Sequence, residues 1–338
     1  MTAPARTPAP SPASPVPART GPAAARRTEV EQLHAAAADG PIDVTVVLPC
    51  FNEVGHVEQE LVRIAAALDA SGYTYDLDVY DDFSTDGTRE LLRELAAGDR
   101  FPRLRYFPRA RNGGSGTIRR IGSQHARGRI VAWTDADMTY PNERIPEFVR
   151  ILDEDGSYDQ VVGARTSEEG TYKLLRVPAK WTIRKIASYL TGTKIPDLNS
   201  GLRTFRREVA IPYLPLLPAG FSCVTTLTVS FLANGHDVKY EPIDYAKRAG
   251  KSKFNFVKDA YRYILQVLRM VMYFNPLKVL MPIALYILGF GFLKLFVDIA
   301  RFGFRVPGST VLVLLTGLQI AALALLADLV VRSRTQSN

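Results

Sequence analysis

The sequence predicts an α/β protein with a mainly parallel sheet, followed by an amphipathic helix and a hairpin of two transmembrane helices. Three observations predict this architecture. Short apolar runs rich in β-branched residues alternate with helical patterns over residues 44–134, which is typical of βαβ units. A basic stretch with interleaved aromatic residues follows. The chain then contains two long apolar runs, each sufficient for a bilayer span of roughly 20 residues.

The first 40 residues are rich in proline and alanine and lack the continuous apolar core of a signal peptide. Such a composition does not bury enough apolar surface to offset the entropy of the chain. We therefore expect residues 1–40 to form a disordered tail, whose arginines could contact anionic lipid.

The net charge of +8 indicates an anionic partner. Lysine and arginine become more frequent between Lys239 and Lys278, directly before the apolar region. This placement favours a membrane surface over nucleic acid. The two cysteines, Cys50 and Cys223, form neither a CxxC pair nor a disulfide framework and fit a reducing cytosol.

Strand and helix patterns alternate through the catalytic domain that we expect over residues 41–253. The first β-branched run covers residues 44–48, and Pro49 is expected to end that strand. Ligands of such sheets bind outside the carboxyl ends of the strands, so the loops that follow strands should carry the function. The expected strands are 44–48, 77–80, 104–107 and 130–134, and the expected helices are 57–68, 86–97 and 115–126.

The C-terminal third is predicted to be attached to a membrane. Residues 254–275 mix basic and aromatic residues, as an amphipathic interfacial helix does, with a buried packing helix as the alternative. Residues 276–331 contain the two predicted transmembrane helices, and Lys294 and Asp298 are four residues apart, so they could pair. The excess of basic residues before the first helix and after the second predicts a cytoplasmic catalytic domain and a cytoplasmic tail over residues 332–338.

The sequence Asp135-Ala136-Asp137 ends the strand that contains Trp133 and is the sharpest chemical signal. In an extended segment, residues two apart project to the same side. Two such carboxylates can hold Mg²⁺ or Mn²⁺ and leave coordination positions for diphosphate oxygens. A solvated acidic loop is the alternative, and the preceding apolar strand argues against it.

Acidic and aromatic residues also follow the first two predicted strands. The carboxylates of Asp81 and Asp82 could accept hydrogen bonds from a base or ribose, whereas Asp86 is expected to cap the next helix. At the end of the first strand, the segment from Pro49 to Glu53 could line a nucleoside pocket through backbone groups, an aromatic face and one carboxylate.

The glycine-rich segment over residues 112–116 resembles a dinucleotide fingerprint only superficially. Arg119 occupies the position of the third glycine, and no ribose-binding pattern follows, so a dehydrogenase is excluded. The remaining interpretation is a flexible loop that faces a phosphate and leads into a helix.

Taken in order, Pro-x-aromatic-Asn-Glu, DDxSxDGT, Asn-x-Gly-x-Gly and DAD resemble the motifs of family 2 glycosyltransferases of GT-A fold, over residues 43–166. Later segments resemble the polyprenyl-phosphate branch that includes dolichyl-phosphate mannose synthase. They are Val162-Gly163-Ala164-Arg165, the stretch from Asp197 to Arg203, and the stretch from Lys247 to Phe254. The two apolar helices agree with that branch, so the resemblance extends loosely to residue 331.

The resemblance implies a role for each matching position. The metal and the donor diphosphate would be held by Asp135 and Asp137, which with Arg165 and Arg203 make up the expected catalytic residues. The acceptor phosphate or the donor diphosphate would be held by Arg165, Arg203, Ser252 and Lys253. The expected nucleotide-sugar site comprises Pro49, Phe51, Glu53, Asp81, Asp82, Asp135, Ala136 and Asp137.

Two departures from related patterns qualify this assignment. Relatives often have Leu-Gln after DAD, whereas this chain has Met138-Thr139, which leaves the third protein contact to the metal open. The chain also lacks the QxxRW motif of processive polysaccharide synthases, and two predicted spans are too few for a polymer channel.

The predicted function is the inverting transfer of a sugar from a GDP- or UDP-linked donor to polyprenyl phosphate at the cytoplasmic membrane face. Its expected partners are the donor, the acceptor, the bilayer and a divalent cation, with a homo-oligomer possible and nucleic acid excluded. Three alternatives stay open. They are transfer to another lipid such as diacylglycerol, nucleotidyl transfer, and a catalytically silent membrane scaffold or flippase partner.

Overall fold

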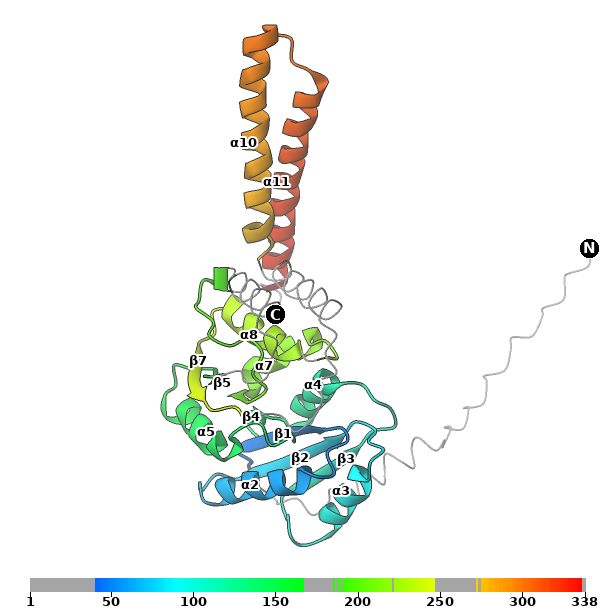
Figure 1. Cartoon of the computed structure of the whole chain (residues 1–338). Coiled ribbons are helices and arrows are strands. Elements are labelled where there is room, and N and C mark those ends of the chain that lie inside the picture. The colour runs from blue at the N-terminus through cyan, green and yellow to red at the C-terminus, as the bar shows by residue number, and fades with distance from the viewer. Residues whose placement is uncertain are drawn as a thin grey trace, which may run out of the picture.

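The computed structural model describes residues 40–166, 191–220, 222–246 and 275–335, together with Lys185, Ser188, Tyr189 and Met272. The tail expected over residues 1–40, except for Gly40, and nearly all of the helix expected over 254–275 lie outside this range. So do Ser252, Lys253 and the last three residues of the C-terminal tail. A sheet domain and a long helical hairpin make up the described chain (Figure 1).

The sheet has seven strands in the order β3-β2-β1-β4-β6-β5-β7. The strands β1 to β4 are mutually parallel, β5 and β7 pair in parallel, and β6 runs antiparallel to both β4 and β5. The α/β class with a mainly parallel sheet is therefore confirmed. The strands are β1 (Val44–Cys50), β2 (Tyr75–Asp81), β3 (Leu104–Pro108), β4 (Ile130–Trp133), β5 (Gln160–Arg165), β6 (Arg203–Arg206) and β7 (Val238–Ile243).

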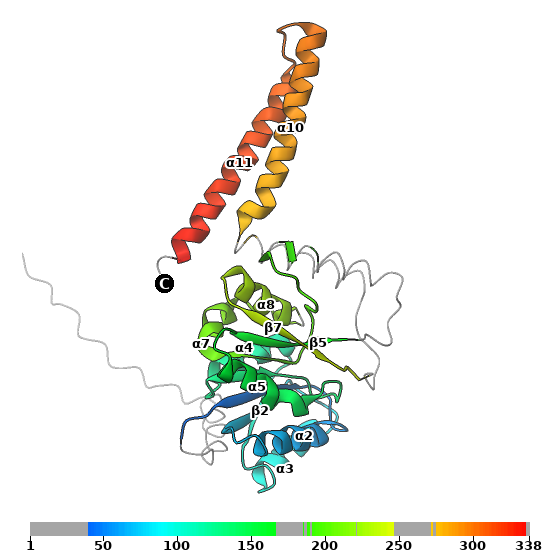
Figure 2. The same ribbon diagram turned by 90° about the vertical axis from the view of Figure 1, so that its left-hand side faces the viewer.

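Helices cover both faces of the sheet (Figure 2). On one face, α2, α3 and α5 pack against the side chains of Val44, Val46 and Leu48; on the other, α4 and α8 pack around Val47, Trp133 and Phe205. This alternation along β1 is the period of two that a strand buried on both faces requires. The helices are α2 (Val57–Asp69), α3 (Thr88–Ala97), α4 (Ser115–His125), α5 (Ile145–Glu154), α7 (Arg207–Ala210) and α8 (Cys223–Ala233), with 3₁₀ turns η1 (Asn142–Arg144) and η2 (Ile211–Leu216).

The expectation that Pro49 ends the first strand is wrong, because β1 continues to Cys50. Pro49 is aligned with Tyr80 of β2, but the pairing of β1 with β4 ends at Val47. In a parallel strand, the backbone N–H and C=O groups of alternate residues point to opposite neighbouring strands. The Cys50 carbonyl accepts the N–H of Asp82 on the β2 side. The backbone of Pro49 therefore points to the side of β4, and β4 has already ended there. The missing N–H of proline thus removes no hydrogen bond of the sheet.

The hairpin consists of α10 (Pro276–Phe302) and α11 (Gly308–Thr335), and residues 303–307 connect them. Both helices are long and apolar enough to cross a membrane, judged by length and composition. Glycines allow them to approach closely: a Cβ on Gly291 would lie 2.7 Å from Leu314, and a Cβ on Gly317 would lie 2.7 Å from Leu288. The predicted pairing of Lys294 with Asp298 is confirmed at 2.7 Å.

Candidate functional site at the carboxyl edge of the sheet

The loops that follow β1 and β2 are tied together at the carboxyl edge of the sheet. The backbone N–H of Asn52 donates to Ser84 Oγ over 2.9 Å, and the N–H of Thr85 donates to Asn52 Oδ1 over the same distance. A backbone bond of 2.8 Å from Asp82 to Cys50 lies directly below them. These cross-links give the edge a fixed shape although the strands have ended.

Asp135 and Asp137 follow β4 on this same edge, with their backbone anchored by the buried side chain of Ala136. Asp135 Oδ1 accepts a 2.7 Å bond from Arg119, and Asp137 Oδ1 accepts a 2.5 Å bond from the Thr139 hydroxyl. Thr139 therefore orients Asp137, which is a concrete role for the residue that departs from the related motif. Asp135 keeps 27% of its side chain exposed.

Arg119 is a functional candidate that sequence reasoning missed. Its side chain is 1% exposed, and its guanidinium lies over the ring of Trp133 at 5.6 Å from the ring centre. It belongs to the face of α4 that packs on the sheet together with Gly122 and Ser123. Gly122 and Ser123 lie three and four positions after Arg119, on the same face of the helix. Such small residues indicate a face in close contact with the sheet, and this pattern could have predicted that Arg119 is buried.

A further buried carboxylate, Glu60 of α2, supports the turn that follows Asp137. Glu60 accepts a 2.7 Å bond from Asn142 and forms an ion pair of 3.3 Å with Arg63. Burial raises the pKa of Glu60 above its ordinary value. Arg63 also contacts Met138 and Glu143, so this network connects α2 to both sides of the turn.

The residues expected to meet a nucleoside are exposed to different degrees. Phe51 is 40% exposed at this edge. The Asp81 carboxylate is buried, where it accepts a 3.0 Å bond from the N–H of Ser84 and pairs with Arg89 at 2.8 Å. The backbone of Glu53 is fixed by Thr88, whose hydroxyl accepts its N–H. The expected interaction of Asp86 with the start of the next helix is present, because Asp86 accepts the N–H and hydroxyl of Thr88, the first residue of α3.

The glycine loop leads into α4 as expected, but the N–H groups of its three glycines are bonded within the protein and do not face a phosphate. The N–H groups of Gly113 and Gly114 donate to the Asp82 carboxylate over 2.8 and 2.7 Å. The N–H of Gly116 donates to the carbonyl of Ala219, and a Cβ at Gly116 would lie 2.1 Å from the carbonyl oxygen of Pro218. These glycines therefore permit close packing of the backbone, and Asp82 holds this loop in place.

The two candidate phosphate-binding arginines differ. Arg165 forms a two-pronged ion pair with Asp197 (2.7 and 2.9 Å) and lies over the ring of Tyr245. Burial alone would raise the pKa of Asp197, but the hydrogen bonds and charge of Arg165 lower it below the ordinary value. The N–H of Ala246, next to Tyr245, donates to the Thr139 carbonyl, so Arg165 lies near the Asp137 turn.

Arg203 does not occupy a position that suits phosphate binding. It is fully buried on β6, where it donates to the carbonyls of Val224 and Ser200 and to the hydroxyl of Thr228. Burial lowers its pKa to about 10. The expected contact of Arg203 with a phosphate is therefore corrected to a packing role between β6 and α8.

The carboxylate oxygens of Asp135 and Asp137 suit a divalent cation that is also bound by a substrate. Mg²⁺ is commonly held by one or two carboxylates and by substrate phosphates and water. Among the described residues there is no cluster of three or more His, Cys, Asp or Glu side chains that could hold a metal. Two carboxylates with further positions left for phosphate oxygens match that requirement, since the protein alone does not complete the coordination sphere.

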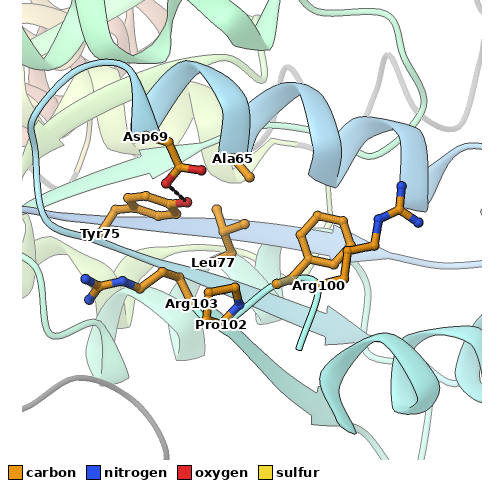
Figure 3. Close-up of a pocket in the computed structure, with 8 residues that line it drawn as sticks. Ala65, Asp69, Tyr75, Leu77, Arg100, Pro102 and Arg103 are labelled. Atoms are coloured by element: carbon orange, nitrogen blue, oxygen red, sulfur yellow. Dashed lines mark hydrogen bonds between the residues drawn. The ribbon is translucent and has the colours of Figure 1, made fainter. Parts of the chain in front are cut away.

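A small hollow elsewhere in the domain is not part of this site. It lies between α2 and the segment before β3, where Tyr75 donates a 2.7 Å bond to Asp69 (Figure 3). Tyr75 begins β2 whereas Asp81 ends it. The hollow therefore lies at the amino ends of the strands, whereas the acidic pair lies at their carboxyl ends.

The sheet topology and the acidic pair define a class of protein, and sequence comparison identifies it. Residues 45–214, half of the chain, match glycosyl transferase family 2. The protein therefore belongs to glycosyl transferase family 2. Residues 275–332 match the GtrB C-terminal hairpin, which agrees with the position of α10 and α11.

Several curated proteins are similar to this chain. An undecaprenyl-phosphate 4-deoxy-4-formamido-L-arabinose transferase of Shewanella sediminis is 30% identical over 218 residues, which are 63% of this chain and 62% of that protein. A dodecaprenyl-phosphate galacturonate synthase of Rhizobium johnstonii is 27% identical over 237 residues, which are 70% of this chain and 68% of that protein. The chain thus spans less than two thirds of the length of the Shewanella relative.

Solved structures share the fold. Glucosyl-3-phosphoglycerate synthase from Mycobacterium tuberculosis, in complex with Mn²⁺, uridine diphosphate and phosphoglyceric acid, has a TM-score of 0.55 at 20% identity, covering 72% of this chain and 82% of that one. Its complex with Mn²⁺, UDP-glucose and phosphoglyceric acid gives 0.55 at 21% identity, covering 72% and 83%. The predicted GT-A fold is confirmed.

Proposed function

We propose that this protein transfers a sugar from a nucleotide-sugar to polyprenyl phosphate and releases the nucleoside diphosphate. The observation that carries this proposal is the combination, in one chain, of a family 2 glycosyltransferase domain and a GtrB-type hairpin. Proteins that are similar to it are named as undecaprenyl-phosphate and dodecaprenyl-phosphate sugar transferases. The apolar helices support a lipid acceptor, because they would keep the sheet domain beside a bilayer.

The proposed domain organisation has a catalytic domain over residues 41–253 and a membrane attachment over residues 254–331. The tails over residues 1–40 and 332–338 and the catalytic domain would be cytoplasmic, since lysine and arginine predominate on that side of the helices. In this arrangement the donor comes from the cytosol and the acceptor phosphate from the membrane surface.

The reaction is proposed to be a single displacement with inversion at the anomeric carbon. An oxygen of the acceptor phosphate forms the new bond to that carbon, and the bond to the nucleoside diphosphate breaks on the opposite side. A phosphate monoester is already ionised near neutral pH, so the step does not require a strong general base. Retention of configuration in the first lipid-linked product would contradict this version.

The protein's own residues mainly position two anions in this mechanism. Arg119 and Thr139 hold the carboxylates of Asp135 and Asp137, so these need little reorganisation during the reaction. A divalent cation at this pair, Mg²⁺ or Mn²⁺, would neutralise charge on the departing diphosphate. The donor's nucleoside would contact the segment from Pro49 to Glu53 and the loop after Asp81.

The acceptor phosphate needs cationic partners near the membrane. Lys253 and Ser252 are proposed for this role, and the chain enters their segment from Ala246, which is bonded to Thr139 beside the acidic pair. Arg165 is proposed to line the same region. Its guanidinium is already paired with Asp197, so we assign it to orientation and not to proton transfer.

The test is sugar transfer by the full-length protein in detergent. Labelled GDP-mannose, UDP-glucose and UDP-N-acetylhexosamines would each be offered with and without polyprenyl phosphate and with Mg²⁺ or Mn²⁺. We expect a lipid product, labile to mild acid, from one donor, and a loss of at least about 100-fold in rate for Asp137→Ala. Val62→Ala, an exposed apolar substitution on α2, serves as the control and should keep the rate.

The outcomes separate this proposal from its alternatives. A product formed with diacylglycerol and not with polyprenyl phosphate would replace the acceptor, and release of pyrophosphate would indicate nucleotidyl transfer. Failure to bind any nucleotide-sugar in the presence of metal would leave only a scaffold or flippase partner.

A further inference from the structure

Backbone strain is concentrated at the proposed donor site. Among the described residues, the non-glycine positions with left-handed φ are Asn52 (59°), Phe83 (71°) and Met138 (61°). They follow β1, β2 and β4 respectively, all at the carboxyl edge. Because left-handed φ is disfavoured for L side chains, its occurrence after three strands at one edge points to a functional constraint.

Two of these three residues have local reasons for their conformation. Asn52 tolerates the left-handed region, and its side chain accepts the N–H of Thr85. Met138 lies between Asp137 and Thr139, and its sulfur contacts Arg63 at 3.7 Å. Phe83 has neither the tolerance of asparagine nor a buried packing site, since it is 43% exposed.

The ring of Phe83 is held at a fixed place beside Asp81. The guanidinium of Arg89 lies 5.4 Å from the ring centre, and the same guanidinium pairs with the Asp81 carboxylate at 2.8 Å. The adjacent residue, Ser84, donates its N–H to Asp81 and accepts the N–H of Asn52 on its hydroxyl. The loop therefore presents an exposed aromatic ring on a backbone that is fixed from both sides.

The neighbouring loop carries a second exposed aromatic side chain. Phe51 follows β1, is 40% exposed and directly precedes Asn52, whose hydrogen bonds join the two loops. An exposed aromatic ring on a rigid loop at this edge is suited to stacking on a heterocycle.

We propose that Phe83 is the stacking platform for the nucleobase of a nucleoside diphosphate. This inference rests on the proposed function, which supplies the nucleotide ligand. Phe83 contributes affinity by contact of its ring face with the base and not by stabilising the fold. Its left-handed backbone presents that ring to the base. The buried Asp81 carboxylate, paired with Arg89 and bonded to the N–H of Ser84, holds the loop that carries the ring.

The test compares ligands with and without a base on the full-length protein in detergent with Mn²⁺. Binding of UDP, GDP and inorganic pyrophosphate would be measured by calorimetry for the wild type and for Phe83→Asn, Phe83→Gly and Phe83→Tyr. Asparagine and glycine accept left-handed φ but remove the ring, whereas tyrosine keeps it. Val62→Ala is the matched control, an exposed apolar residue on the neighbouring helix.

We expect Phe83→Asn and Phe83→Gly to bind the preferred nucleotide about 5- to 100-fold more weakly, because base stacking on aromatic rings has that weight. Pyrophosphate should bind the same within about twofold, and Phe83→Tyr should resemble the wild type. The Tm of Phe83→Gly should not fall below that of the wild type, since glycine relieves the backbone conformation. Loss of affinity without loss of stability is the signature of a binding role.

Three results would overturn the inference. The first is unchanged nucleotide affinity in both Phe83→Asn and Phe83→Gly. The second is an equal loss of affinity for nucleotide and for pyrophosphate. The third is a wild-type protein that binds none of the three ligands. If nucleotide binding depends on Phe83 but no sugar is transferred to any acceptor, the inference stands and the proposed function fails. If transfer occurs and its donor KM is indifferent to Phe83, the proposed function stands and the inference fails.

Discussion

The carboxyl edge of the sheet and the turn end of the hairpin contain similar side chains but connect them differently. At the edge, the two carboxylates have separate partners: Asp135 pairs with Arg119, and Asp137 accepts a hydrogen bond from the Thr139 hydroxyl. In the hairpin, Lys294 Nζ contacts both Asp298 and Thr310 at 2.7 Å, and Thr310 also bonds Asp298. There each charge has its counterpart.

The difference separates a binding site from a structural contact. A closed set of lysine, aspartate and threonine needs nothing else, and buried charges in apolar surroundings are tolerable only when paired in this way. At the edge, the Asp135 carboxylate stays 27% exposed, so it can also meet a cation from solution. Substitutions at the edge should therefore change ligand binding, whereas those in the hairpin should change stability alone.

The largest expected effect is at Arg119. Arg119→Met removes the only buried cation described on Asp135, and breaking a buried pair costs about 3–5 kcal/mol of unfolding free energy. Metal-dependent nucleotide binding should fall as well, because Asp135 loses its orientation. Urea denaturation and calorimetry would measure the two effects. Arg119→Lys keeps the charge and should recover part of both the stability and the binding. A fully stable Arg119→Met would show that the Arg119–Asp135 pair does not stabilise the fold.

A cluster of two aspartates and two arginines inside the sheet domain should behave as a structural one. Asp76 and Asp78 are buried; Arg105 pairs with both, and the more exposed Arg127 pairs with Asp76. Burial raises the pKa of Asp78 to about 8. The folded state therefore keeps a proton that the unfolded state loses, so stability should fall as pH rises from about 4 to 8, by at most about 1.4 kcal/mol per unit.

Asp78→Asn should flatten this dependence without altering nucleotide affinity. The measurement is the urea midpoint of both proteins at several pH values between 5 and 8. Parallel curves for the two proteins would show that Asp78 is already ionised in the folded state.

The next effect concerns the hairpin. Asp298→Asn leaves Lys294 without its carboxylate partner, so the Tm in detergent should fall by several degrees while nucleotide binding stays unchanged. The double variant Lys294→Leu, Asp298→Leu removes both charges and should regain most of that loss. Weakened nucleotide binding in the single variant would assign the cluster a role beyond stability.

The smallest effect compares two threonines that each hold a carboxylate. Thr139→Val removes the hydroxyl bound to Asp137 and should slow transfer about fivefold, as expected for one hydrogen bond of about 1 kcal/mol. Thr310→Val removes the corresponding hydroxyl in the hairpin and should leave transfer unchanged. Equal rates for both variants would mean that Thr139 does not position Asp137 during the reaction.

Much of the fold could be predicted from the sequence because strands and helices have local periodicity. The strands before Asp81 and Asp135 and both apolar helices follow from such patterns. The boundary at Pro49 could not be predicted, since it depends on where the neighbouring strand β4 ends.

The site was predictable where a motif follows a strand and less so where burial decides. The position of Asp135 and Asp137 at the carboxyl edge is visible in the sequence, but the partner Arg119 is 16 residues earlier and reads as a solvated helix residue. Arg203 was misassigned for the opposite reason. The sequence does not distinguish an arginine that donates to backbone carbonyls inside the fold, as Arg203 does, from one that binds a phosphate.

The hairpin returns the chain to the side from which it entered, since α10 leads away from the sheet domain and α11 leads back (Figure 1). For the proposed reaction, this attachment would turn the encounter with the acceptor into a search within a plane. The acceptor concentration that matters is then its mole fraction among the lipids, whereas the donor is counted per volume of solution. Diluting the acceptor with inert lipid, at constant total amounts of protein, acceptor and donor, should slow transfer.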